Sequence, residues 1–162
     1  MTVETVTPCE LLQLLSIAIA TGLFTADEAD GLLGGILDQL ASNSLPAGHS
    51  ALLCRRSPGS AAVGWTYFAP DPHADGVWNV WWLGVEPGAH GAGAGALLLR
   101  QAEAEAAAKG GRLMIIETSA TDSLARARRF YEKEGYSKCG CVPDFYRDGD
   151  DKIIFTRPPR SA

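Results

Sequence analysis

The sequence predicts an α/β protein of the α+β kind, in which a mixed central sheet is flanked by about four helices. Two helical segments come first, and the three strand-like segments after them are close enough in sequence to form an antiparallel meander. Only the β-α-β segment in the middle of the chain can supply a parallel crossover, which argues against a doubly wound sheet. The 162 residues fit one domain over 1–162, with an N-terminal helical segment at 1–49 and a core at 50–157.

Both N-terminal helices are predicted from the spacing of apolar residues. Residues 8–21 form the first helix, which has Pro8 near its start and is too short to cross a membrane. The second helix follows Thr25, and Glu28 three residues later completes a capping box. Its buried face has the i, i+3, i+4, i+7 spacing of one helix side and consists of Ala29, Leu32, Leu33, Ile36, Leu37 and Leu40.

The remaining elements are bounded by turns rich in glycine, proline and aspartate. The expected strands are 51–56, 62–68, 77–85, 113–118, 136–142 and 152–157. The expected helices run over 93–109 and from Thr121 or Asp122 to Gly135. Residues 143–151 are assigned to a loop between the last two strands, and this exposed final hairpin could support a homodimer.

Composition and charge limit the possible partners. A net charge of −5 argues against nucleic acid, because that contact needs a basic surface. The four cysteines contain no C-x-x-C pair and no zinc-like histidine spacing, so we expect reduced thiols and no metal. His49 and His73 lie in polar loops and are expected on the surface. Acidic rather than basic residues precede the first apolar segment, so a cytoplasmic protein without membrane contact is predicted.

The segment from Val85 to Leu98 carries the strongest chemical signal in the sequence. It follows a predicted strand, contains glycines at the alternate positions 91, 93 and 95, and opens into a long alanine-rich helix. Glycine gives such a loop free access to positive φ, and a helix N-terminus presents unpaired N–H groups to an anion. The segment therefore predicts a site for a phosphate or pyrophosphate.

The glycines of this segment also occur in other kinds of loop. A P-loop is excluded, because no Lys-Ser or Lys-Thr follows them. Gly91-x-Gly93-x-x-Ala96 fits the dinucleotide fingerprint, and Glu117 lies where a ribose-binding acid would stand, but a meander precedes the loop in place of a βαβ series. A nicotinamide-dependent oxidoreductase stays an alternative, as does a glycine turn that serves only close helix–strand packing.

Two motifs that are one helix and one strand apart resemble the GCN5-related N-acetyltransferase (GNAT) superfamily. The first, Val85-Glu86-Pro87 followed by residues 90–98, is similar to the V-x-P and R/Q-x-x-G-x-G/A signatures of that family. The second, over 130–136, is similar to its F-Y-x-K-x-G-F/Y motif. The resemblance extends over residues 50–157, through further blocks typical of a bacterial and archaeal subgroup at 81–85, 116–119 and 143–152.

The resemblance implies a GNAT-like acyl-CoA N-acyltransferase fold with acetyl-CoA as the co-substrate. Backbone N–H groups of the glycine loop would hold the CoA pyrophosphate, and the preceding strand would pair with the pantetheine arm. His90 and Ala94 depart from the Arg or Gln and the bulky residue that the family has at these positions. The cofactor-binding residues that it implies are Leu83, Gly84, Val85, His90, Gly91, Ala92, Gly93, Ala94, Gly95, Ala96 and Lys133.

Acetylation of an amine needs a neutral nucleophile and a proton for the departing thiolate. By the resemblance, Tyr131 is the general acid, and the alternative is an inward-facing core tyrosine. Glu117 is the expected base, because apolar neighbours at the end of a buried strand can raise the pKa of a carboxylate; the alternative is a structural hydrogen-bond acceptor. The expected acceptor-binding residues are Tyr67, Trp82, Asp144 and Tyr146.

The predicted function is transfer of the acetyl group of acetyl-CoA to a primary amine of a small molecule, by direct attack in a ternary complex. The acidic net charge suits a cationic acceptor. A protein N-terminus is the alternative acceptor. A catalytically silent acyl-CoA-binding sensor or structural protein is the alternative function.

Overall fold

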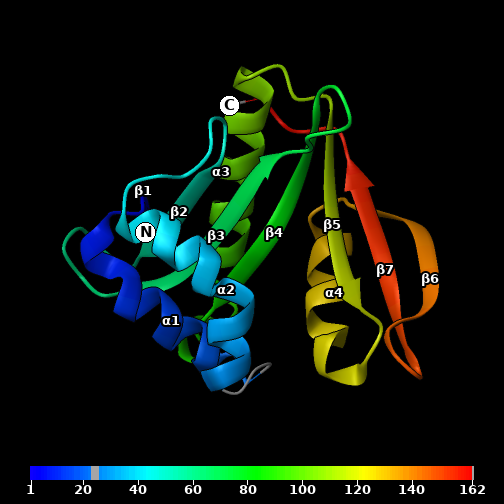
Figure 1. Cartoon of the computed structure of the whole chain (residues 1–162), viewed down its shortest axis with the longest axis horizontal. Helices are drawn as coiled ribbons and strands as arrows, with labels where there is room; N and C mark the ends of the chain where they lie inside the picture. The colour runs from blue at the N-terminus through cyan, green and yellow to red at the C-terminus, as the bar shows by residue number, and fades with distance from the viewer. Residues whose placement is uncertain (23–25, 162) are drawn as a thin grey trace. The chain divides into compact units, whose positions relative to one another are not determined.

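The computed structural model describes residues 1–22 and 26–161, apart from the side chains of residues 26, 28, 30 and 32. In this part of the chain, strands form a seven-stranded mixed sheet in the order β1-β2-β3-β4-β5-β7-β6 (Figure 1). The strands are β1 Thr2–Thr5, β2 Ser50–Arg55, β3 Ala62–Pro70, β4 Val77–Val85, β5 Leu113–Ser119, β6 Ser137–Arg147 and β7 Asp150–Arg157. The helices are α1 Leu11–Ala20, α2 Ala26–Ala41, α3 Ala94–Ala108 and α4 Ala125–Lys133.

This topology confirms the predicted α+β class. β4 and β5 pair in parallel and are joined through α3, whereas β1–β2, β2–β3, β5–β7 and β6–β7 pair antiparallel. The chain divides into two compact units, one of residues 1–69 with 82–102 and the other of 70–81 with 103–162. Compact units of this kind need not fold independently of each other, so the prediction of one domain over 1–162 stays a prediction.

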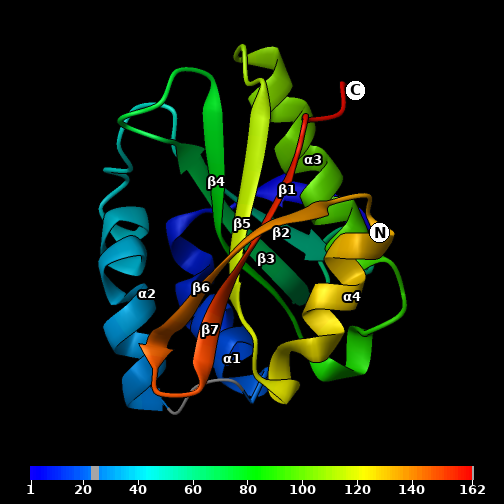
Figure 2. The ribbon, with the colours of Figure 1, turned by 90° about the vertical axis from the view of Figure 1, so that its right-hand side faces the viewer.

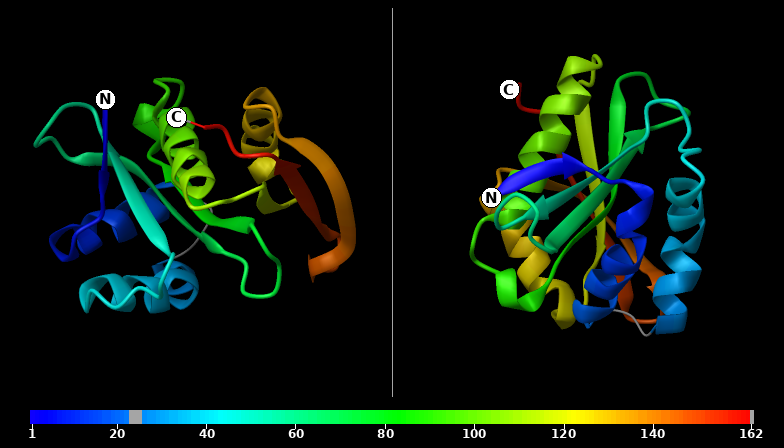
Figure 3. Two further views of the ribbon diagram at one scale, coloured as in Figure 1. Left: turned by 90° about the horizontal axis from the view of Figure 1, so that it is seen from above. Right: turned by 90° about the vertical axis from the view of Figure 1, so that its left-hand side faces the viewer.

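In the first unit, α1 and α2 cover the same face of β2 and β3 (Figure 1, Figure 3). The indole N–H of Trp65 on β3 donates to the carbonyl of Leu14 at 3.0 Å, which fixes α1 on the sheet. The shared core consists of Val6, Leu14, Ile17, Ala18, Leu33, Leu37, Leu40, Ala51, Leu53, Ala62, Trp65, Tyr67 and Trp82.

The N-terminal helices agree with their apolar spacing. Ala29, Leu33, Leu37 and Leu40 of α2 are buried, as the spacing predicts. The capping box predicted at Thr25 and Glu28, and the side chain of Leu32, lie outside the described residues. Among the helices of the described ranges, none is long and apolar enough to cross a membrane.

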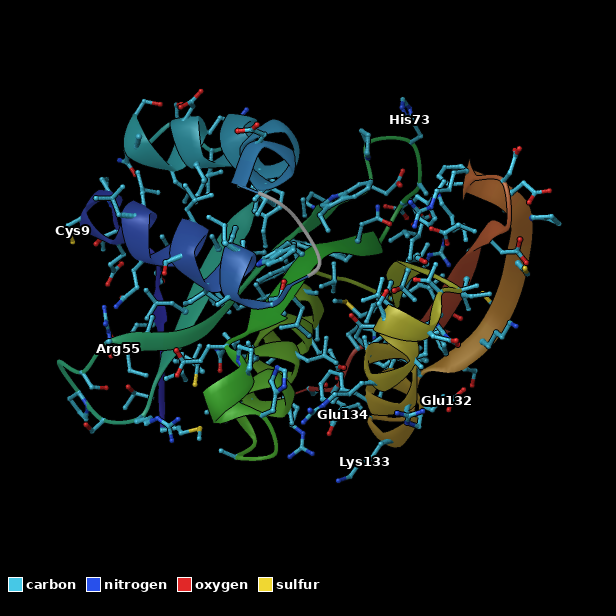
Figure 4. All side chains as sticks on the ribbon, turned by 90° about the horizontal axis from the view of Figure 1, so that it is seen from below. Cys9, Arg55, His73, Glu132, Lys133 and Glu134 are labelled. Carbon is cyan, nitrogen blue, oxygen red and sulfur yellow. The ribbon has the colours of Figure 1, made fainter. Side chains whose placement is uncertain are left out.

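The short strand β1 was not predicted. Its residues Thr2–Thr5 pair antiparallel with Arg55–Leu52 of β2. Arg55, labelled in Figure 4, holds this edge by pairing with Glu4 at 3.2 Å and with Glu10. Val3 is the one apolar residue among these four, which is too few to give an apolar periodicity, so only the tertiary pairing reveals this strand.

In the second unit, β5, β7 and β6 lie side by side, and α4 lies beside them (Figure 2). Rings of Tyr131 on α4 and Phe155 on β7 meet with centroids 5.8 Å apart. Gly110 and Gly135, with φ of 83° and 86°, follow α3 and α4 and end these helices as predicted.

The assignment of residues 143–151 to a loop was wrong. β6 continues to Arg147 and β7 begins at Asp150, so Asp144 and Tyr146 lie on a strand. The pairing register shifts between Val142 and Arg147, and Asp144 has a φ of 51°. Pro143 and Asp144 are turn-forming residues, but an edge strand with an irregular register tolerates both.

Candidate active site

The glycine loop has the geometry of an anion site. Gly91 and Gly93 adopt φ of 80° and 93°, and α3 begins directly after them. Leu97 N–H donates to the carbonyl of Gly93 at 3.0 Å, so the N–H groups of residues 94–96 precede the first hydrogen bond within the helix. A Cβ at Gly91 or Gly93 would meet nothing within 4 Å. The loop therefore has both the donors and the open space that a pyrophosphate needs.

His90 directs its imidazole toward the preceding strand. Its Nε2 lies 2.8 Å from the carbonyl oxygen of Val85, which can only accept, so Nε2 carries the proton. In a neutral ring of this tautomer, Nδ1 is an acceptor and has no N–H for a phosphate. Donation from the ring to an anion then requires a protonated His90, and the backbone N–H groups remain the main donors.

Gly84 allows Trp82 to fold over the end of β4. Residues 82 and 84 share one face of the strand, and a Cβ at Gly84 would lie 2.4 Å from Cζ2 of Trp82. The Trp82 ring packs on Trp65 with centroids 5.5 Å apart, and its backbone carbonyl accepts from the hydroxyl of Thr66 at 2.7 Å. Trp82 is only 8% exposed, so its described contacts are those of a core side chain. Leu83 and Val85 are half-buried beside it.

Replacing Gly84 by alanine is expected to destabilise the protein. The added methyl group must displace the indole of Trp82 or the β4 backbone, and such overpacking costs about 1–3 kcal/mol. Gly35 in α2 is the matched control, because a Cβ there meets nothing within 4 Å and alanine is favoured over glycine in a helix by roughly 0.5–1 kcal/mol. Urea unfolding should give effects of opposite sign for Gly84→Ala and Gly35→Ala. Equal effects would contradict the close contact.

Tyr67 is paired with a histidine that the sequence placed on the surface. The Tyr67 hydroxyl lies 2.5 Å from Nδ1 of His49, which is half-buried. Burial raises the pKa of Tyr67 and lowers that of His49, so at neutral pH the phenol donates to a neutral imidazole. The surface assignment of His49 was wrong. The pair is separated by 18 residues, a distance that leaves no local signal.

Glu117 and Tyr146 are brought together with a lysine that was not predicted. The carboxylate of Glu117 on β5 pairs with Nζ of Lys152 on β7 at 2.6 Å. This ammonium lies 3.4 Å from the ring centroid of Phe145, whose ring meets that of Tyr146 at 5.0 Å. Burial, then the charges of Glu117 and Asp150, raise the pKa of Tyr146. Phe145 and Tyr146 are 51% and 46% exposed, but Lys152 already lies over one face of the Phe145 ring.

The surroundings of Glu117 differ from those expected. Its side chain is 37% exposed and forms an ion pair, whereas the argument for a base assumed apolar neighbours. Its role as the base stays a prediction that now lacks this support.

Asp144 organises the turn between β6 and β7. Its carboxylate accepts from the N–H of Gly149 at 2.7 Å, and its own N–H donates to Asp151 at 3.0 Å. These bonds explain its left-handed φ of 51°. The described contacts therefore give Asp144 a structural role. Its part in binding the acceptor stays a prediction.

Tyr131 is a buried phenol on the inner side of α4. It is 8% exposed, and its ring contacts those of Phe130, Tyr136 and Phe155 at centroid distances of 5.5, 6.4 and 5.8 Å. Burial raises the pKa of Tyr131 to about 12. The hydroxyl therefore carries its proton at every pH at which the protein works, as a general acid must.

All four tyrosines are expected to ionise at higher pH in the folded protein than in the unfolded chain, since burial raises the pKa of Tyr67, Tyr131, Tyr136 and Tyr146. For Tyr131 the ordinary value is 10 and the folded value about 12, so its contribution to stability is complete below pH 10 and is lost as the pH rises to 12. Tyr131→Phe should reduce this alkaline loss by roughly 3 kcal/mol. Tyrosinate absorbance that rises equally in native and guanidinium-unfolded protein near pH 10 would contradict the expected shifts.

Lys133 lies at the C-terminal end of α4. Figure 4 shows its side chain directed away from the helix, and the residue is exposed. A cation at this end of a helix is favoured by the helix dipole, whether or not it also binds the co-substrate. Among the described residues, no group of three or more His, Cys, Asp or Glu side chains is arranged to hold a metal ion.

A glycine loop at the N-terminus of the crossover helix is typical of enzymes that use a phosphorylated co-substrate. Residues 25–136 match the model of a family described as Acetyltransferase (GNAT) family. The match spans more than half of the sequence, and the chain belongs to this family. It is an acetyltransferase, and the family uses acetyl-CoA. No curated protein matches the sequence.

Three solved structures are similar to the whole chain. A protein from Desulfovibrio desulfuricans, assigned to the GNAT acetyltransferases, is 29% identical over 98% of this chain and 99% of its own, with a TM-score of 0.89. An aminoglycoside 6'-N-acetyltransferase complexed with coenzyme A is 17% identical over 100% and 99%, with a TM-score of 0.75. A ribosomal-protein-alanine N-acetyltransferase from Brucella melitensis is 17% identical over 98% and 99%, with a TM-score of 0.74. The last two share the fold, and their acceptors differ from each other.

Proposed function

We propose that this acetyltransferase acts on a primary amine of a small molecule, by direct attack within a ternary complex, with Tyr131 as the general acid. The observation that carries the proposal is the buried phenol of Tyr131, whose pKa is raised to about 12. Its place within the 130–136 motif supports the same role. An acid that never loses its proton below pH 10 suits a reaction that must protonate a thiolate.

We assign the binding of acetyl-CoA to backbone groups of the first motif. The N–H groups of Gly91 and of residues 93–96 would hold the pyrophosphate, since the N–H of Ala92 donates to the carbonyl of Ala89 at 3.3 Å. The half-buried Leu83 and Val85 at the end of β4 would pair with the pantetheine arm. When bound, the co-substrate supplies an acetyl group activated as a thioester. Lys133 would add a positive charge, and His90 would add an N–H only when its ring is protonated.

Tyr131 would act on the leaving sulfur. Moving a proton from a phenol of pKa about 12 to a thiolate whose thiol has a pKa near 8.5 costs roughly 5 kcal/mol. The phenol therefore stabilises the sulfur mainly as a hydrogen-bond donor, and the transfer is completed as the attacking nitrogen loses its own proton. The nitrogen–carbon bond forms, the carbon–sulfur bond breaks, and the sulfur takes the proton of Tyr131. Glu117 takes the amine proton, and the phenolate of Tyr131 regains a proton from solvent after the thiol has left.

Glu117 is the proposed acceptor of the amine proton. Its carboxylate pairs with Nζ of Lys152 at 2.6 Å, and its 37% exposure gives the proton a route to solvent. The same part of the second unit favours a cationic amine. Residues 144–151 include the carboxylates of Asp144, Asp148, Asp150 and Asp151. The exposed ring of Tyr146 beside them adds a face that attracts an ammonium group.

The proposal is tested by acetyl-CoA-dependent thiol release with a panel of spermidine, L-lysine, an aminoglycoside and a peptide that begins with alanine. We expect release with one of the small amines and initial-rate lines that intersect, as direct transfer in a ternary complex requires. Release with the peptide alone would replace the acceptor by a protein N-terminus. Tight binding of acetyl-CoA without release for any amine would contradict the proposal and support a silent sensor.

A further inference from the structure

Glu103 is a buried carboxylate that takes no part in the proposed chemistry. Its residue on α3 is 0% exposed. The Tyr136 hydroxyl donates to Oε1 at 2.9 Å, while Nε of Arg160 lies 2.9 Å from Oε2 and the backbone N–H of Arg160 lies 3.3 Å from it. A buried ion pair is weak evidence for stability, because desolvation offsets the attraction, but it can fix one geometry.

Two arginines extend the contacts of Glu103 to the end of α4. Arg157 Nη1 and Arg160 Nη2 each donate to the backbone carbonyl of Glu134 at 2.5 Å. Arg160 Nη1 also pairs with the Glu134 carboxylate at 3.2 Å. Cations at a helix C-terminus satisfy its unpaired carbonyls and interact favourably with the helix dipole. The last turn of α4 is thus held by side chains that also bind Glu103.

The same helix end is tied to Tyr131 through Tyr136. Tyr136 N–H donates to the Tyr131 carbonyl at 3.0 Å, and Gly135 N–H donates to the Glu132 carbonyl at 2.9 Å. With Gly135 at a φ of 86°, these two bonds form a Schellman motif. The Tyr136 ring also meets the Tyr131 ring edge-on, with centroids 6.4 Å apart. Tyr136 therefore contacts Tyr131 by its backbone and ring, and Glu103 by its hydroxyl.

We propose that Glu103 is a positioning residue for Tyr131, acting through Tyr136 and through the grip of Arg160 on the end of α4. The inference rests on the proposed function, because it matters for the rate only if Tyr131 is the acid. In the proposed mechanism, neither Glu103 nor Tyr136 contacts the thioester or the amine. Their effect is on where the phenol of Tyr131 stands, and a displacement of about 1 Å can cost roughly 100-fold in rate.

Kinetics of Tyr136→Phe give the first test, because this change removes the hydroxyl and keeps the ring and the backbone bond. With the amine that supports the fastest thiol release, we expect kcat to fall roughly tenfold while KM for acetyl-CoA stays unchanged. In the Tyr131→Phe background the same change should have no further effect on kcat. If Tyr136→Phe lowers kcat by the same factor in the Tyr131→Phe background as in the wild type, the proposal is overturned. Asn79→Ala is the matched control, since it removes a buried hydrogen bond of 2.9 Å to Asp71 and should lower Tm alone.

Fluorine NMR gives a second test that needs no acceptor. Fluorotyrosine labels the four tyrosines, and the loss of one line in Tyr131→Phe assigns the Tyr131 resonance. In Glu103→Gln we expect this line to broaden or split, because the phenol samples more than one position. A sharp, unmoved line in a folded Glu103→Gln variant would overturn the proposal, and Tyr136→Phe serves if Glu103→Gln does not fold.

The two proposals fail in different ways. If Tyr131→Phe leaves kcat unchanged, the proposed function fails, whatever the Tyr131 line shows. If Tyr131→Phe lowers kcat but Tyr136→Phe does not, the positioning role of Glu103 fails and the role of Tyr131 stands.

Discussion

Tyr131→Phe is expected to lower kcat by about 10²- to 10⁴-fold, the usual contribution of a general acid. The substitution removes only the hydroxyl and keeps the ring contacts with Phe130, Tyr136 and Phe155. The Kd of acetyl-CoA should therefore change little, since the proposed binding groups lie in the glycine loop, at the end of β4 and at Lys133, and do not include the Tyr131 hydroxyl. Thiol-release kinetics and calorimetric titration of acetyl-CoA measure the two quantities separately.

The kcat of Tyr131→Phe, rather than the pH dependence of the wild type, distinguishes a general acid from a core tyrosine. Because the pKa of Tyr131 is raised to about 12, its ionisation cannot produce a decline in kcat below pH 10. An unchanged kcat in Tyr131→Phe would remove this residue as the acid. The alternative interpretation as a core tyrosine would then hold, and only Tm would differ between the variant and the wild type.

Gly93→Ala is expected to weaken acetyl-CoA binding by about 5- to 30-fold, the equivalent of the roughly 1–2 kcal/mol that a left-handed φ costs a residue with a Cβ. Gly93 has a φ of 93°, and the variant must either keep this strain or turn its peptide groups away from the anion. The expected loss is in Kd, which calorimetric titration measures directly.

Gly88→Ala is the matched control for the loop. Gly88 lies in the short 3₁₀ helix Pro87–Ala89, has no positive φ, and a Cβ there would meet nothing within 4 Å. We expect its Kd for acetyl-CoA to equal that of the wild type. Similar Kd values for Gly88→Ala and Gly93→Ala would show that the left-handed geometry of the loop is not needed for binding.

Local signals allowed most of the fold to be predicted. The ends of α3 and α4 follow from Gly110 and Gly135, whose positive φ values end the helices. The buried face of α2 follows from its apolar spacing, and the crossover from β4 to β5 from the order of elements. In each case a few consecutive residues determine the structure.

Features that depend on distant residues were missed or misjudged. β1 forms only by pairing with β2. The length of β6 depends on its pairing with β7, and because β6 is an edge strand it tolerates Pro143. The same limit applied at the candidate site. The motifs located the glycine loop and Tyr131, whereas the pairing of Glu117 with Lys152 and of Tyr67 with His49 joins residues far apart in sequence.

The most direct test of the central claim is the ratio of CoA thiol to N-acetylated amine, measured in one reaction by absorbance and mass spectrometry. With the best amine of the panel, the wild type should form the two products in equal amounts, and Tyr131→Phe should form both at an equally reduced rate. Thiol release without an acetylated amine, or equal rates in the wild type and Tyr131→Phe, would contradict amine acetylation with Tyr131 as the acid.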